Sequence, residues 1–143
     1  MAPADTSRNI LGLARAIYLW LGTLATLDSS RRDRIAKFAD AIAATLQRAA
    51  DSLARLEADP GDKAAHRGLV RELGRISGYV ETIVEVLEHH LDGRKLAGVK
   101  RRLEQLAMHE ATGVGRMPPD RARADRLLAA EGYFRALADG LRA

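Results

Sequence analysis

The chain has 143 residues and no cysteine, which excludes a disulfide scaffold, a thiolate metal site and a cysteine nucleophile. Alanine (26) and leucine (20) dominate while aromatic residues make up only 4%, so composition favours an all-α protein over a β-sandwich or a collagen-like chain. The net charge is +4 with 19 arginines against 4 lysines, and the length predicts a single domain over residues 1–143.

The first predicted helix opens at residues 5–7 and runs to about Leu27. Between residues 10 and 27 only Arg15 is charged, and apolar side chains occur on nearly every side of the helix. A central arginine costs about 2.5–3.5 kcal/mol in bilayer insertion, so a buried helix is favoured over a membrane span or a secretory signal. The default location is then the cytoplasm.

A helix that is apolar all round is either enclosed by its neighbours or shared with a partner chain. Tyr18 and Trp20 project about 200° apart at 100° per residue, so we expect one to face the core and the other a partner. The sequence therefore predicts a homodimer whose self-association surface contains Ile17, Trp20, Leu21 and Leu24.

Two long helices follow in the middle of the chain. Apolar residues recur at steps of three and four from Ile35 to Leu56, which predicts a rod of about 40 Å. Residues 59–62 read Asp-Pro-Gly-Asp, a tight turn, and a third helix is predicted from about Lys63 to Leu91. Such a short connection places the two rods in an antiparallel hairpin.

The third predicted helix contains two glycines one turn apart, Gly74 and Gly78. We interpret them as a point where another helix backbone approaches closely, with a ligand at the backbone as the alternative. Glu81, Glu85 and Glu88 share one face further along the same helix.

A fourth helix is predicted from about Arg94 to Ala111, a loop over residues 112–119, and a fifth helix after Asp120. The pattern contains no alternation typical of strands. Together the segments predict an all-α fold, an antiparallel four- to five-helix bundle with a long central helical hairpin.

Charge is distributed unevenly, with a balance of −1 over residues 1–93 and +5 over residues 94–143. The basic part could neutralise the glutamates of the third helix, or it could contact RNA, DNA or an acidic protein. No helix-turn-helix pattern or zinc finger accompanies it. The candidate binding residues are Arg94, Lys95, Lys100, Arg101, Arg102, Arg116, Arg121 and Arg123.

Six residues separate Arg102 from His109 on the fourth predicted helix. This spacing resembles the Arg-x4–6-His motif of HEPN-type ribonucleases, which are small all-α proteins that often dimerise. The resemblance implies that His109 acts as general acid or base and that Arg102 stabilises the phosphate.

The histidines do not form a converging metal set, since Glu85 and His89 lack a second half on another helix, so no metal or cofactor is expected. The sequence thus favours a non-catalytic interaction, adaptor or assembly module that binds a protein partner, itself or another chain, through its helix faces. A nucleic-acid-binding subunit and a HEPN-like ribonuclease are the alternatives.

Overall fold

The computed structural model describes residues 6–87, 97–98, 101 and 121–143. Within these ranges the chain forms helices only, which confirms the all-α bundle. The helices are α1 (Thr6–Tyr18), α2 (Leu21–Leu24), α3 (Ser29–Ala58), α4 (Lys63–Leu87) and α6 (Arg121–Arg142). The fourth helix predicted from the sequence falls almost wholly outside the described residues.

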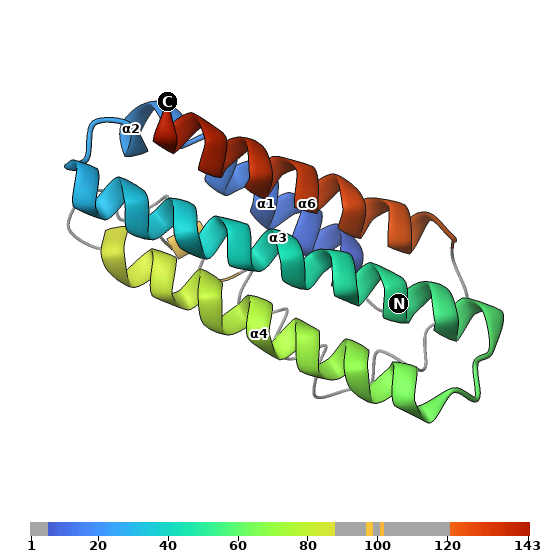
Figure 1. Cartoon of the computed structure of the whole chain (residues 1–143). Coiled ribbons are helices and arrows are strands. Elements are labelled where there is room, and N and C mark those ends of the chain that lie inside the picture. Colours follow the sequence, from blue (N-terminus) through green and yellow to red (C-terminus); the bar gives the residue numbers. More distant parts are fainter. Residues whose placement is uncertain (1–5, 88–96, 99–100, 102–120) are drawn as a thin grey trace.

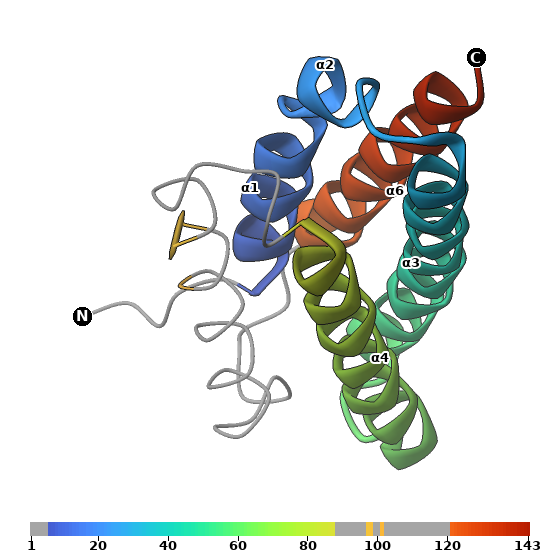
Figure 2. The same ribbon diagram turned by 90° about the vertical axis from the view of Figure 1, so that its left-hand side faces the viewer.

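Helix α3 makes the most extensive packing contacts among the described helices. It packs against α4 on one side and α6 on the other, and α1 packs against α6 (Figures 1 and 2). Helices α3 and α4 form the predicted hairpin, and α6 runs opposite to α3 (Figure 1). Helix α1 runs parallel to α6: Ser7 meets Arg126 near the N-terminal ends of both helices, and Leu21, in α2 just after α1, meets Gly140 near the C-terminal end of α6.

Aspartates fix both ends of the hairpin turn. Asp59 Oδ1 accepts a hydrogen bond from the Gly61 amide at 3.0 Å, and Asp62 Oδ1 accepts one from the Ala65 amide at 2.9 Å. Asp62 thereby caps the first turn of α4, because its carboxylate satisfies an amide that has no partner within the helix.

The first predicted helix is interrupted in the structure. Helix α1 ends at Tyr18, where the Trp20 amide bonds to the Ile17 carbonyl at 3.0 Å, and α2 starts at Leu21. This turn carries Trp20, Leu24 and Leu27 against the rest of the core, which closes one end of the bundle.

The core combines apolar faces from α1, α3, α4 and α6. Its largest fully buried side chains include Phe134, Ile17, Ile42, Leu73 and Ile76. Of the described helices, none has both the length and the apolar character needed to cross a membrane.

The predicted self-association surface is wrong, because the helix that carries it packs against α6. Ile17 and Leu24 are fully buried and Trp20 is 6% exposed, so these side chains are core residues rather than partner contacts. Leu21 is partly buried and packs against Gly140 of α6. The chain itself covers the apolar residues that the sequence assigned to a second copy.

Candidate interaction surface

The solvent side of α4 carries a set of exposed residues that we call the α4 outer face. Apolar residues recur along the opposite side of this helix and pack into the core, which leaves the outer face uncovered. Its members are Lys63, Arg67, Arg71, Gly74, Arg75, Gly78, Glu81 and Glu85.

The N-terminal half of the α4 outer face is basic. Lys63, Arg67, Arg71 and Arg75 follow one another at intervals of four residues, so each cation lies beside the next one along the helix. Like charges at this spacing destabilise a helix. In the parts of the chain that the structure describes, none of the four makes an ion pair, in contrast to Arg48, Arg55 and Arg142.

The C-terminal half of the same face is acidic, with Glu81 and Glu85. Helix α4 has no acidic residue in its first turn and no basic residue in its last turn. The helix dipole favours the reverse arrangement, with acids near the N-terminus and cations near the C-terminus. The charges of the α4 outer face are therefore not arranged to stabilise the helix that carries them.

Two glycines stand near the boundary of the two halves: Gly74 directly precedes Arg75, and Gly78 lies between Arg75 and Glu81. Among the described residues, a Cβ atom added at either position would meet no atom within 4 Å, so each would point into open space. Gly68 differs, because a Cβ there would lie 3.2 Å from Ser52 Oγ on α3. Close packing against α3 explains why a glycine stands at position 68, but it does not explain the glycines at positions 74 and 78.

A polar network holds α4 in a fixed orientation on α3. Arg48 Nε donates to Glu72 Oε2 at 3.2 Å, and Arg48 Nη2 donates to Thr45 Oγ1 at 3.1 Å. Thr45 Oγ1 in turn donates to the Ala41 carbonyl at 2.7 Å. Because the Glu72 carboxylate is nearly buried, rotation of α4 would separate it from Arg48, so this contact favours the orientation in which the outer face is directed to solvent.

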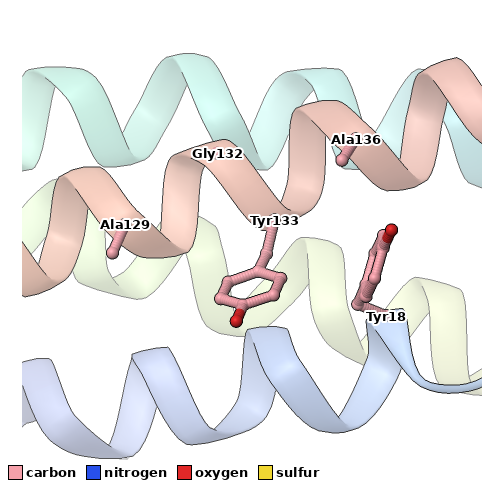
Figure 3. A pocket seen from close by; sticks show the side chains of 5 residues that line it. All are labelled: Tyr18, Ala129, Gly132, Tyr133 and Ala136. Atoms are coloured by element: carbon pink, nitrogen blue, oxygen red, sulfur yellow. The ribbon is translucent and has the colours of Figure 1, made fainter.

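A second surface feature is an open hollow of about 300 Å³ between α1 and α6 (Figure 3). The Tyr18 and Tyr133 rings lie in it with centroids 5.5 Å apart, and Arg15 Nε donates to Tyr133 Oη at 3.4 Å. The other lining residues are Ala129, Gly132 and Ala136, so the lining supplies no carboxylate or imidazole. Of the two aromatic residues in the first predicted helix, Trp20 faces the core from the turn before α2, and Tyr18 at the end of α1 faces this hollow.

The predicted basic site is only partly described. Arg101 is exposed, and Arg121 begins α6. Arg123 is 7% exposed and its buried Nε has no hydrogen-bond partner among the described residues, which corrects its assignment to an exposed binding surface. The remaining candidates lie outside the described residues, as do both members of the ribonuclease motif; they are Arg94, Lys95, Lys100, Arg102, His109 and Arg116.

Sequence reasoning missed the cations of the α4 outer face, because the net charge of residues 1–93 is close to zero. The four-residue spacing of the cations from Lys63 to Arg75 was the sequence pattern from which this face could have been predicted.

No group of three or more histidine or acidic residues within the described ranges could hold a metal ion. Comparison of the chain with protein-family models, curated proteins and solved structures finds no match.

Proposed function

We propose that this protein is a non-catalytic interaction module that binds a protein partner through the α4 outer face. The observation that carries the proposal is a row of four cations that have no ion pair among the described residues, on a helix whose opposite side contacts α3 through the Arg48–Glu72 ion pair. Such charges lower the stability of the isolated helix, and an oppositely charged partner removes that cost.

The α4 outer face carries both positive and negative charges, which favours a protein partner over a nucleic-acid partner. A nucleic acid would gain from Arg67 and Arg71 but would be repelled by Glu81 and Glu85 further along the helix. A protein surface can present acids to the first half and bases to the second half, which uses the whole face.

The test is a pair of charge reversals of equal size. The Arg67→Glu, Arg71→Glu variant changes the α4 outer face, and the Arg34→Glu, Lys37→Glu variant changes exposed cations on α3 by the same total charge. Each protein is crosslinked in cells that express it, and the attached chains are quantified by mass spectrometry. We expect the α3 variant to keep the wild-type contacts and the α4 variant to lose them. Equal contacts for all three proteins would overturn the proposal.

Nucleic-acid binding is a second candidate, favoured by the basic half of the same face. Four residues of helix rise about 6 Å, so the four cations form a row along which a phosphate backbone could lie. Glu81→Gln with Glu85→Gln separates the two candidates. The change strengthens binding of a fluorescent oligonucleotide, measured by anisotropy, if the ligand is a nucleic acid, and it weakens protein crosslinking if the partner is a protein.

A further inference from the structure

We infer that the partner of the α4 outer face is a second copy of this chain, with the two α4 helices packed antiparallel about a two-fold axis. The inference rests on the proposed function, since it names the occupant of the same face. Three features support it: the azimuth of the charges, their symmetry about one point, and the glycines at that point.

Arg67 and Glu85 point in the same direction from α4. They are 18 positions apart, and at 3.6 residues per turn this separation is about five complete turns. A cation and an anion therefore occupy one line along the helix, about 27 Å apart. A second α4 helix laid along this line in the opposite direction would place its glutamate beside the first helix's arginine.

Four of the six charges on the α4 outer face are also symmetric about a single point. Residue 76 is the midpoint between Arg67 and Glu85, and it is equally the midpoint between Arg71 and Glu81. A two-fold axis beside this point brings each arginine level with the matching glutamate of the second copy, which sets four opposite-charge pairs along one isologous interface. A parallel pairing in register would instead oppose like charges, so the pattern selects the antiparallel orientation.

The glycines lie where two such helices would cross. Gly74 and Gly78 are themselves symmetric about residue 76, both are exposed, and both have open space where a Cβ atom would stand. Without side chains at the crossing, the two backbones can approach more closely than ordinary helices do. Close approach also shortens the distance that the flanking arginines must span to reach the glutamates.

Sedimentation velocity from about 1 µM to about 1 mM protein tests the inference. We expect a monomer–dimer equilibrium at low salt that weakens about tenfold or more at high salt, because the contacts are exposed ion pairs. The Arg67→Glu, Arg71→Glu variant and the Glu81→Arg, Glu85→Arg variant should each be monomeric. Their equimolar mixture should form a one-to-one heterodimer, because the mixture restores all four opposite-charge pairs. The Arg34→Glu, Lys37→Glu control should dimerise like the wild type.

The glycines provide an independent measurement. Gly74→Ala with Gly78→Ala should raise the thermal midpoint of the monomer, since alanine favours helix, and should weaken dimerisation about tenfold or more, since two methyl groups enter the crossing. Gly132→Ala on α6 is the matched control, because its Cβ also meets open space away from α4. It should raise the midpoint without changing dimerisation.

The failures of the two proposals are distinguishable. The wild-type protein could stay monomeric throughout while the Arg67→Glu, Arg71→Glu variant still loses its crosslinked partners in cells. That result would overturn the second copy as the partner but would leave the α4 outer face as the interaction surface. A dimer that persists in both charge variants overturns this geometry. A mixture of the two variants that stays monomeric also overturns it.

Discussion

Arg48 on α3 and Glu72 on α4 lie side by side across the hairpin, with Arg48 Nε donating to Glu72 Oε2 at 3.2 Å. About half of the arginine side chain is exposed, whereas the glutamate side chain is only 11% exposed. The contact thus joins a nearly buried carboxylate to a cation that reaches solvent. It fixes which side of α4 faces α3 and, by consequence, which side faces outward.

Removal of Arg48 is therefore expected to destabilise the protein. Arg48→Ala leaves the Glu72 carboxylate without this partner, and we expect a loss of about 1–3 kcal/mol in the free energy of unfolding from urea denaturation. Glu72→Gln keeps an acceptor oxygen for Arg48 and should cost less. Arg34→Ala, an exposed change on the same helix, should stay within about 0.5 kcal/mol. A loss for Arg48→Ala as small as that control would contradict the assigned role.

Asp62 should make stability depend on pH in the acid range. The hydrogen bond from the Ala65 amide, helped by the neighbouring Arg55 guanidinium, holds the pKa of the Asp62 carboxyl below its usual value. A lowered pKa in the folded state means that the stabilisation is complete above the unfolded-state pKa and is lost as pH falls through the folded-state pKa.

The Asp62→Asn variant tests this dependence. Asparagine also caps a helix but does not titrate, so the difference in thermal midpoint between wild type and variant should shrink as pH falls from 6 through the acid range below about 4. Asp62→Ala should lower the midpoint at neutral pH. A difference between wild type and Asp62→Asn that stays constant with pH would show that the cap makes no titratable contribution.

Trp20 and Leu19 are neighbours in sequence with opposite environments. Trp20 is 6% exposed in the core and Leu19 is 82% exposed. We expect Trp20→Ala to cost about 3–5 kcal/mol and Leu19→Ala to stay within about 0.5 kcal/mol, as measured by circular dichroism during urea denaturation. Equal losses for the two variants would mean that Trp20 does not pack as described.

Gly132 and Gly140 on α6 should respond differently to alanine. A Cβ at Gly132 has nothing within 4 Å, so Gly132→Ala should stabilise the protein by up to about 1 kcal/mol through helix propensity. A Cβ at Gly140 would lie 2.9 Å from Leu21 Cδ2, so the leucine side chain must move. We expect Gly140→Ala to gain less than Gly132→Ala in thermal denaturation. A larger gain at Gly140 would mean that α2 does not press against α6.

The helices could be read from the sequence more completely than the candidate site. The Asp-Pro-Gly-Asp turn and the apolar spacing around it are local features, and both the turn and the two long helices are present in the structure. The apolar spacing indicates which side of α4 is buried, but no local pattern states whether another helix covers the opposite side, the α4 outer face. A charge balance taken over 93 residues also hides four cations when acids elsewhere cancel them.

The sequence by itself determined the all-α class, the long hairpin and its aspartate-capped turn, because helix propensity, apolar periodicity and caps act over a few residues. Only the tertiary structure decided that Trp20 enters the core, that Tyr18 lies in a surface hollow and that Arg123 is buried. It also decided that the face from Lys63 to Glu85 is left open to solvent. These outcomes depend on contacts between helices far apart in the chain, since the environment of a side chain is set by the neighbour that covers it.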